Sequence, residues 1–440
     1  MTADEYLARA KSLAPCVPSL APGTPVRPIR TVGVLGAGTM GCGIAMACAN
    51  VGLSVTLVDS SADALERGTQ RVAVEYGASV ARGRIDQAES ASRIARIVPQ
   101  ASCDALASSD LIIEAVYEDL ALKQSLFRII DSVAKPGALL ATNTSGLDIN
   151  AIASVTRRPA DVVGAHFFSP AQVMKLLEVV RADATSDEAI ASLMAWAPTL
   201  GKVPVLSQVN EGFIGNALFR QYHREAHFMV EEGASPAAVD SAQVGFGYAM
   251  GLFAVHDMAG NDVGYPTKKA QIANRPAGRR YTDLILDLCD AGRLGQKAGA
   301  GWYRYDRSSA NPRKPVADPW IDNWLSQKRS ELGMVPRAVS PDEIVDRCIF
   351  SMVNEAAKLL ERGIAQRASD IDVAMVLGYG FPAARGGPLF HADALGLGKV
   401  LAAIEGFQKA HGWWWEPAPL LRQLVAQGQS LSTWEQPQAN

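Results

Sequence analysis

The chain has 440 residues, of which 48% are hydrophobic and 20% charged, a composition typical of a soluble globular protein of about three domains. Its formal net charge of −3 excludes the strongly basic surface that general binding to nucleic acid or to acidic membranes requires. An acidic ligand must therefore be held by a local cluster of charges.

The cysteines and the chain ends give no sign of export. The six cysteines are scattered without a CxxC pair, and the N-terminus lacks the basic-then-apolar order of a signal peptide. No apolar run reaches the roughly 20 residues that span a bilayer. The C-terminus, Gln438-Ala-Asn440, is not a peroxisomal address of the Ser-Lys-Leu type. We therefore expect a cytoplasmic protein without membrane or nucleic-acid partners.

The N-terminal half alternates between short β-rich runs and helical stretches. Residues 2–13 predict a short helix, and five prolines between residues 15 and 28 predict an extended connector. The alternation that follows predicts a mostly parallel, doubly wound α/β sheet covered on both faces. Strands are expected at 31–35, 53–58, 111–115, 138–141, 162–165, 176–180 and 203–206, and helices at 40–51, 62–82, 119–134 and 186–200.

After residue 208 only helices are expected, at 212–232, 236–245, 343–362 and 369–377. Two stretches resemble each other, because Gly245-Phe-Gly-Tyr248 recurs as Gly378-Tyr-Gly-Phe381. The repeat predicts an all-α domain made of two tandem helical copies. The predicted domains are 1–29 (N-terminal helix and proline-rich linker), 30–208 (sheet domain), 209–305 (first helical copy), 306–340 (connection) and 341–440 (second helical copy).

A glycine-rich loop follows the first strand. The segment Gly36-Ala-Gly-Thr-Met-Gly41 is a GxGxxG motif that opens a helix, and Asp59 ends the next strand. Its glycines permit a tight turn, the approach of a pyrophosphate to the backbone and close helix–strand packing. Asp59 would accept hydrogen bonds from the adenosine ribose and repel a 2′-phosphate. The motif predicts a Rossmann-type domain that binds NAD, with Thr39 and Met40 beside the cofactor.

Three polar residues lie in or after strands of the predicted sheet. His166 follows the strand at 162–165, where open α/β sheets place ligands, and its imidazole suits a general base that takes a hydroxyl proton. Glu178 in the next strand could hold the imidazole, and Ser145 would face the same crevice. Each residue alone is ordinary in a folded core. Together they predict a site for hydride transfer.

These residues give the chain a resemblance to the 3-hydroxyacyl-CoA dehydrogenase family from about Arg30 to Leu401. The shared motifs are Val32–Gly41, Glu114-Ala-Val-Tyr-Glu118, Asn143-Thr-Ser145, His166-Phe-Phe-Ser-Pro170, Lys175-Leu-Leu-Glu178 and Gly212-Phe-Ile-Gly-Asn216. The resemblance implies that His166 and Glu178 are catalytic and that Ser145 and Asn216 position the substrate. It also implies that the cofactor contacts are Gly36, Gly38, Thr39, Met40, Gly41, Asp59, Glu118, Lys123, Ser145 and Ser169.

The implied reaction is the reversible, NAD-dependent oxidation of an (S)-3-hydroxyacyl-CoA, as in fatty-acid β-oxidation or short-chain acyl-CoA metabolism. The tandem helical copy resembles the dehydrogenase half of multifunctional fatty-acid oxidation enzymes, without their hydratase half, so hydratase activity is not expected. Because short family members dimerise through one copy, two copies imply a monomer or a loose dimer. Alternatives are a dehydrogenase of a non-CoA hydroxy acid, as in gulonate dehydrogenases, and a non-catalytic NAD-binding protein.

A few residues depart from the family or stand apart from its motifs. Ser169 replaces the usual Asn, and Gly146 stands where Ser or Thr is usual, so a cofactor contact and a loop are in question. Arg82, with Arg84, lies where the family places basic residues for the CoA nucleotide, and a solvated helix end is an equal alternative. His223 and His227 lie one helical turn apart, but no third ligand is evident, so no metal site is expected. Trp413-Trp-Trp415 could cap the core or seal a groove.

Overall fold

The computed structural model describes residues 1–306 and 308–435, which form two compact units. The sheet unit comprises Met1–Ala217, Leu359–Tyr379 and the segment from Ser432 onward. The helical unit comprises Leu218–Lys358 and Gly380–Leu431. The terminal residues Gln438-Ala-Asn440, on which the expected lack of a peroxisomal address rests, lie outside the described residues.

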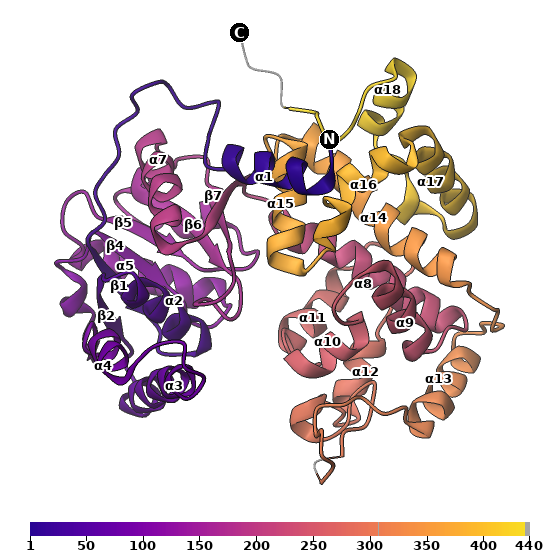
Figure 1. Cartoon of the computed structure of the whole chain (residues 1–440), viewed down its shortest axis with the longest axis horizontal. Coiled ribbons are helices and arrows are strands. Elements are labelled where there is room, and N and C mark those ends of the chain that lie inside the picture. Colours follow the sequence, from indigo (N-terminus) through magenta and orange to yellow (C-terminus); the bar gives the residue numbers. More distant parts are fainter. Residues whose placement is uncertain (307, 436–440) are drawn as a thin grey trace. The chain divides into compact units, whose positions relative to one another are not determined.

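The sheet unit is built on eight strands in the order β3-β2-β1-β4-β5-β6-β7-β8 (Figure 1). All neighbours are parallel except β6 and β7, which are antiparallel. The confirmed strands are runs of buried apolar residues, which is what a sheet covered on both faces requires. The strands are β1 Thr31–Leu35, β2 Ser54–Val58, β3 Ile97–Gln100, β4 Leu111–Glu114, β5 Leu139–Thr142, β6 Val162–Phe167, β7 Leu176–Arg181 and β8 Val203–Gln208.

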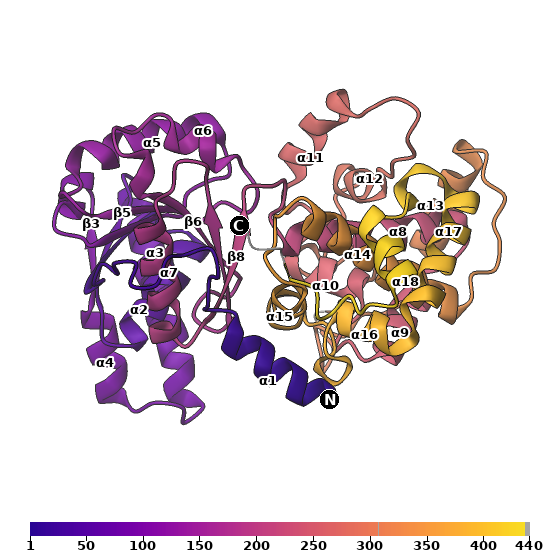
Figure 2. The same ribbon diagram turned by 90° about the horizontal axis from the view of Figure 1, so that it is seen from above.

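Helices cover both faces of this sheet. In Figure 2, α5 and α6 lie on one side, and α2 and α7 lie on the other. Each side has its own apolar core, and the core beneath α2 and α7 also takes in Val72 and Tyr76 of α3. The bounds are α2 Thr39–Asn50, α3 Ala62–Ala81, α4 Gln87–Ala95, α5 Leu120–Val133, α6 Ile149–Ala153 and α7 Asp187–Trp196.

Four elements of the sheet unit differ from the sequence-based expectation. The edge strand β3 was not predicted, because only Ile97 of its four residues is buried and no apolar run marks it. The short helices α4 and α6 were missed for the same lack of a long periodic pattern. His166 lies inside β6, which continues to Phe167, and does not follow the strand as predicted.

The helical region contains more helices than the sequence predicted. The first copy opens with α8 Gly215–Glu232 and α9 Pro236–Phe246, and the second with α14 Pro341–Glu361 and α15 Ala368–Tyr379, as the repeat predicts. The unpredicted helices are α10 Leu252–Ala259, α11 Tyr265–Gln271, α12 Leu284–Asp290, α13 Pro319–Glu331, α16 Pro388–Leu395, α17 Leu397–His411 and α18 Pro419–Gln427. Most are short, so their periodicity is weak.

The Trp413–Trp415 segment is part of the packing of the helical unit. Trp415 is buried and its ring lies 4.7 Å from that of Phe407. The Trp414 indole nitrogen donates to the Arg280 carbonyl oxygen at 2.8 Å. The Arg279 guanidinium lies 3.3 Å from the centroid of a Trp413 ring, a cation–π contact. The segment therefore caps the core, which was one of the two possibilities left open by the sequence.

Helix α15 belongs to the sheet unit, although the sequence-based domains place it within the second helical copy. It packs on β7 and β8 so closely that a Cβ at Gly378 would lie 2.6 Å from the Leu176 side chain. Helix α1, Ala3–Leu13, packs in turn on α15. The domain boundaries drawn from the sequence remain a prediction.

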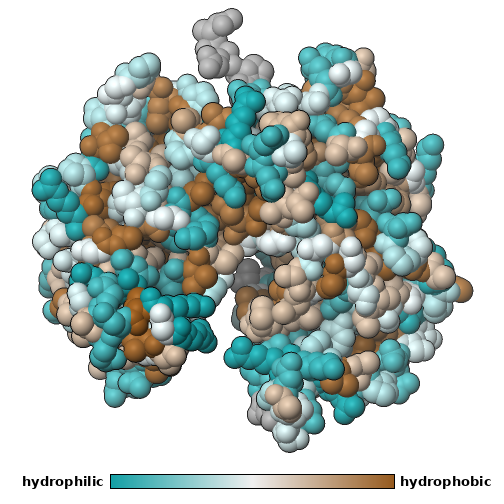
Figure 3. Space-filling view, viewed as in Figure 1, coloured by the Kyte–Doolittle hydropathy of each residue, from teal (hydrophilic) through white to brown (hydrophobic). Residues whose placement is uncertain are grey.

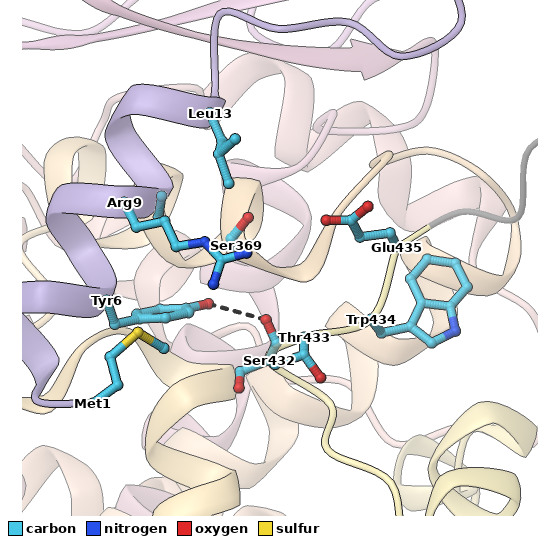
Figure 4. A pocket seen from close by; sticks show the side chains of 10 residues that line it. Met1, Tyr6, Arg9, Leu13, Ser369, Ser432, Thr433, Trp434 and Glu435 are labelled. Atoms are coloured by element: carbon cyan, nitrogen blue, oxygen red, sulfur yellow. Dashed lines mark hydrogen bonds between the residues drawn. The ribbon is translucent and has the colours of Figure 1, made fainter.

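Helix α1 and the described segment Ser432–Glu435 both meet α15. The Tyr6 hydroxyl donates to Asp372 at 2.7 Å and contacts the Ser432 carbonyl oxygen at 3.4 Å. Figure 4 shows Tyr6 and Arg9 of α1 facing Ser369 and the segment from Ser432 to Glu435 around a small pocket. Hydrophilic and hydrophobic patches alternate over the face seen in Figure 3. Among the described residues, no helix is long and apolar enough to cross a lipid bilayer.

Candidate active site

The glycine-rich loop lies between β1 and α2, and its backbone requires glycine at two positions. Gly36 has φ +110°, and a Cβ there would lie 2.7 Å from the Ala115 carbonyl oxygen. A Cβ at Gly41 would lie 1.8 Å from the Gly36 carbonyl oxygen. Gly38 differs, because a Cβ there would meet nothing within 4 Å. Its openness fits a position that a ligand approaches.

The residues around this loop fit a dinucleotide. Gly38 caps α2 without a side-chain hydrogen bond, which leaves N–H groups of the first turn available to a phosphate. Thr39 is exposed and Met40 half-buried in that turn. Asp59 Oδ2 accepts from the Ala37 amide at 3.0 Å, and Oδ1 accepts from Ser61 at 3.0 Å. The carboxylate is thus fixed beside the loop, with further lone pairs for ribose hydroxyls.

His166 and Glu178 face each other across β6 and β7. Antiparallel pairing places the two residues directly opposite in the register, so that their side chains lie on the same face of the sheet. His166 Nδ1 lies 2.7 Å from Glu178 Oε2, and both side chains are buried. The carboxylate accepts only, so Nδ1 carries the proton and the Nε2 lone pair is free. The contact expected from the sequence is present.

The segment Gly212–Asn216 completes the surroundings of this pair. Phe213 has φ +49°, a left-handed conformation that is rare for an aromatic residue. The centroid of the His166 ring lies 5.9 Å from that of the Phe213 ring and 4.4 Å from that of the Phe168 ring. The Gly215 amide donates to Glu178 Oε1 at 2.9 Å. Both oxygens of Glu178 are therefore occupied, and the imidazole is fixed.

Ser145 is tied to Glu118. Glu118 Oε1 accepts from the Ser145 amide at 2.7 Å and from its hydroxyl at 3.0 Å, and from the Thr144 hydroxyl at 2.6 Å. Thr144 also accepts from the amides of Gly146 and Leu147, so the loop is held despite the glycine. A Cβ at Gly146 would lie 3.1 Å from the Gly212 amide, which makes glycine the better fit here.

Lys123 lies at the base of this network. It is buried, and its ammonium group donates to Glu114 Oε1 at 2.7 Å and lies 3.4 Å from Glu118 Oε2. The Thr142 hydroxyl donates to the other oxygen of Glu114 at 2.7 Å. Lys123 thus holds the two carboxylates in place. Its contact with the cofactor, implied by the resemblance, stays a prediction.

Asn216 lies beside Ser145 and takes its orientation from an unpredicted residue, Tyr379. The Asn216 amide nitrogen donates to the Ser145 carbonyl oxygen at 3.1 Å, and the Tyr379 hydroxyl donates to Asn216 Oδ1 at 2.7 Å. A Cβ at Gly215 would lie 2.3 Å from the Tyr379 ring, so the ring packs flush on the start of α8. Ser145, His166, Glu178 and Asn216 are therefore brought together.

Three of the remaining candidates lie at the surface. Ser169 is exposed beyond the end of β6, and Arg82 is exposed at the end of α3, as is Arg84. Their suggested roles toward cofactor and CoA remain predictions. Sequence reasoning missed Glu114 and Tyr379 as site residues. Glu114 begins the family motif Glu114-Ala-Val-Tyr-Glu118, which could have identified it. Tyr379 was marked only by its place in the helical repeat.

The histidine pair on α8 has a third neighbour that the sequence did not suggest. His256 of α10 lies beside His223 and His227, and one ring nitrogen of each lies within 4.8 Å of the others. Helix α10 was not predicted, so the sequence offered no reason to connect this residue with the pair.

Comparison with protein families identifies both regions. Residues 31–210 match the family model described as 3-hydroxyacyl-CoA dehydrogenase, NAD binding domain. The model described as 3-hydroxyacyl-CoA dehydrogenase, C-terminal domain, matches twice, over residues 212–305 and 344–433. The first match confirms the predicted NAD-binding domain. The second confirms the two tandem helical copies.

Individual proteins give the same result. A peroxisomal bifunctional enzyme from Danio rerio is 42% identical over 418 residues, which are 91% of this chain and 57% of that protein. The structure of 3-hydroxybutyryl-CoA dehydrogenase from Escherichia coli K12 matches with a TM-score of 0.76 at 28% identity, over 91% of this chain and 99% of that one. The dehydrogenase part of multifunctional enzyme 1 from C. elegans matches with a TM-score of 0.67 at 25% identity, over 96% and 97% respectively.

Two further points follow from the relatives. The chain spans a little over half the length of the curated relatives it matches, between 56% and 58% for the bifunctional and glyoxysomal proteins. The expected cytoplasmic location is wrong, because these relatives are named peroxisomal or glyoxysomal enzymes. That expectation rested on the lack of recognisable address signals, and such a lack carries no positive information about location.

Proposed function

Because the chain belongs to the 3-hydroxyacyl-CoA dehydrogenase family, we propose that it catalyses the reversible oxidation of an (S)-3-hydroxyacyl-CoA to the 3-ketoacyl-CoA with NAD. The observation that carries this proposal is the 2.7 Å contact between His166 Nδ1 and Glu178 Oε2 on adjacent strands. A buried imidazole with one nitrogen fixed by a carboxylate has the other available as a base.

The proton moves through His166. Its Nε2 takes the proton of the substrate 3-hydroxyl, and the imidazolium that forms is stabilised by Glu178, which keeps its charge throughout. In the reverse direction Nε2 returns the proton to the oxygen at C3. The rings of Phe168 and Phe213 beside the imidazole limit the access of water and strengthen its interaction with the carboxylate.

The nucleotide is held by the loop and Asp59. The first-turn amides of α2 would bind the pyrophosphate, and Gly38 leaves room for its approach. Asp59 accepts hydrogen bonds from the adenosine ribose and selects against a 2′-phosphate. NAD, when bound, supplies the acceptor for the hydride that leaves C3 of the substrate.

Ser145 and Asn216 position the substrate oxygens. The Ser145 hydroxyl donates its one proton to Glu118, so its oxygen is left to accept from the substrate hydroxyl. The Asn216 amide gives one N–H to the Ser145 carbonyl oxygen and keeps a second one, and the Tyr379 hydroxyl fixes the amide through Oδ1. A donor fixed in this way favours the oxygen on which charge develops during the reaction. Arg82 and Arg84 are proposed to attract the phosphates of CoA from the end of α3.

One assay tests the proposal. Purified protein is mixed with NADH and acetoacetyl-CoA, with NADH and a longer 3-ketoacyl-CoA, and with NAD and gulonate, and nicotinamide absorbance is followed. We expect turnover of the thioesters, and a loss of about 10²–10⁴-fold in kcat for His166→Gln with NAD binding retained. His391→Gln serves as the matched control. Turnover of gulonate alone, or full activity in His166→Gln, would contradict the assignment.

A further inference from the structure

Three of the six histidines of the chain gather at one place in the helical unit, and none of them belongs to the candidate active site. His223 and His227 lie one turn apart on α8, and His256 lies on α10. One ring nitrogen of each lies within 4.8 Å of the others. The His223 ring centroid lies 4.1 Å from that of His227 and 4.4 Å from that of His256.

Two of these imidazoles have a buried nitrogen with no hydrogen-bond partner. His227 Nδ1 lies 2.8 Å from the His223 carbonyl oxygen, which can only accept, so Nδ1 carries the proton and Nε2 keeps a lone pair. That Nε2 is buried and has no hydrogen-bond partner, and only 1% of the residue's surface is exposed. His256 Nδ1 is buried and unpaired as well. Buried nitrogens of this kind are rare in folded proteins and call for an explanation.

The surroundings keep the three rings neutral. The Phe253 and Trp302 rings lie 5.1 Å and 5.3 Å from that of His227, so the cluster borders an apolar wall. Burial lowers the pKa of His227 to about 4 and holds the pKa of His223 well below its usual range. Neutral imidazoles repel one another little, and neutral imidazole is the form that binds a metal ion.

We propose that His223, His227 and His256 bind one divalent transition-metal ion of the zinc class and that the ion joins α8 to α10. Two histidines at i and i+4 place their nitrogens on one helix face, and a third from a neighbouring helix completes the set, with water in the fourth position. Zinc–nitrogen bonds of about 2.0–2.1 Å bring ligand nitrogens to roughly 3.3 Å from one another. The three side chains therefore close around the ion by small rotations.

One nearby charge opposes this binding. Burial is the main cause of the lowered pKa of all three histidines, and the positive charge of the Lys268 ammonium group lowers each of them further. The same positive charge repels a divalent cation. Replacing Lys268 by Met should therefore tighten metal binding, which is a result that a purely structural cluster of rings would not give.

The other group of potential metal ligands among the described residues is a poor candidate. Glu232, Glu343 and His411 also lie within ligand distance of one another. The two carboxylates, however, already accept from Arg347 and Arg337 at 2.5–3.5 Å. Their charge is neutralised by these arginines, so the group offers a cation no excess negative charge.

The test uses the untagged full chain, stripped with a chelator and dialysed against Zn²⁺ or Co²⁺. We expect one ion per chain, a visible Co²⁺ absorption of nitrogen ligation, and a melting temperature that rises with metal concentration. His256→Gln and His223→Gln should each lower the affinity by at least about 100-fold, more than the loss of a supporting residue does. His391→Gln, which lies outside the cluster, should bind as the unmodified chain does.

Several results would overturn the proposal. These are the absence of stoichiometric binding, unchanged affinity in both cluster variants, and binding that is lost in His166→Gln, which would place the ion at the candidate active site. Melting curves in chelator show whether each variant is folded. If His256→Gln does not fold, His223→Gln and Lys268→Met decide, because His223 and Lys268 are only partly buried.

Discussion

Glu178 in the sheet unit and Glu232 in the helical unit are both buried carboxylates, but their partners differ. Glu178 accepts from one imidazole and one backbone amide. Glu232 is paired with three arginines, Arg347, Arg280 and Arg337, at 2.6–2.7 Å. A carboxylate fully neutralised by permanent cations can do little but hold helices together. A carboxylate beside a group that gains and loses a proton can take part in a reaction.

The largest effect is expected when the first of these carboxylates, Glu178, is replaced. Glu178→Gln should lower kcat by about 10²–10⁴-fold, because the amide cannot stabilise the imidazolium. The stability should change little, since the glutamine oxygen can still accept from the Gly215 amide. Steady-state kinetics check the loss of kcat, and urea unfolding checks the stability. A variant with normal kcat would show that the carboxylate is only a packing residue.

The second-largest effect is expected when Arg347, a partner of the other carboxylate, Glu232, is replaced. Arg347→Met removes a buried cation from Glu225, which keeps Arg224, and from Glu232, which keeps Arg280 and Arg337. It should cost up to about 3–5 kcal/mol of unfolding free energy, measured with urea. NAD binding should be unchanged in the folded variant. The exposed pair of Arg422 and Glu405 supplies the control, since Arg422→Met should cost less than about 1 kcal/mol. Equal losses in the two variants would contradict the comparison.

The pH dependence of stability sharpens the same contrast. Burial raises the pKa of Glu232, but the hydrogen bonds and charges of the three arginines outweigh burial and bring it to about 2, below the ordinary 4.5. A lowered pKa in the folded state stabilises the protein above pH 4.5, and this contribution is lost as the pH falls toward 2. Tryptophan fluorescence melts should show a fall in that window. In Arg347→Met the fall should be shallower.

A smaller effect separates ligand binding from folding inside the sheet unit. Gly38→Ala places a Cβ in open space at φ −73°, so the melting temperature should hardly change. NAD affinity should fall about tenfold, or ~1.4 kcal/mol, because the backbone no longer admits the pyrophosphate. Gly41→Ala should instead lower both the melting temperature and the NAD affinity, because its Cβ would clash with the Gly36 carbonyl oxygen. Calorimetry of NAD binding checks both variants, and unchanged affinity in Gly38→Ala would count against the proposed cofactor position.

The smallest expected effect concerns Tyr379. Tyr379→Phe removes the hydroxyl that donates to Asn216 at 2.7 Å. A neutral hydrogen bond contributes about 0.5–1.5 kcal/mol, so kcat/KM should fall about two- to tenfold with the stability nearly unchanged. Tyr281→Phe in the helical unit is the control. A loss confined to stability would make Tyr379 a packing residue rather than a positioning one.

The sequence predicts best where local pattern and chemistry coincide. The strands around the glycine loop and the loop itself follow from apolar runs and one motif, so β1, β2 and Asp59 could be placed in advance. The antiparallel step from β6 to β7 could not, because strand direction leaves no periodic signal. That step is what places His166 opposite Glu178 in the register.

Long-range contacts are the other limit. Tyr379 lies 163 residues after Asn216, and no local pattern links the two. His256 lies on a helix of eight residues, too short for a clear periodicity. Glu114, the buried partner of Lys123, was missed for a different reason. It ends an apolar strand, and the sequence shows the carboxylate there but does not indicate which residue it pairs with.

The interleaved order of the two units affects how the chain is made. The sheet unit starts at Met1 but is complete only with α15 and the segment from Ser432, whereas the helical unit fills the two intervals between. A chain leaving the ribosome therefore presents the β7–β8 surface long before α15 exists to cover it. Translation speed and chaperone access between residues 217 and 359 should thus influence the yield of folded protein more than changes near either end.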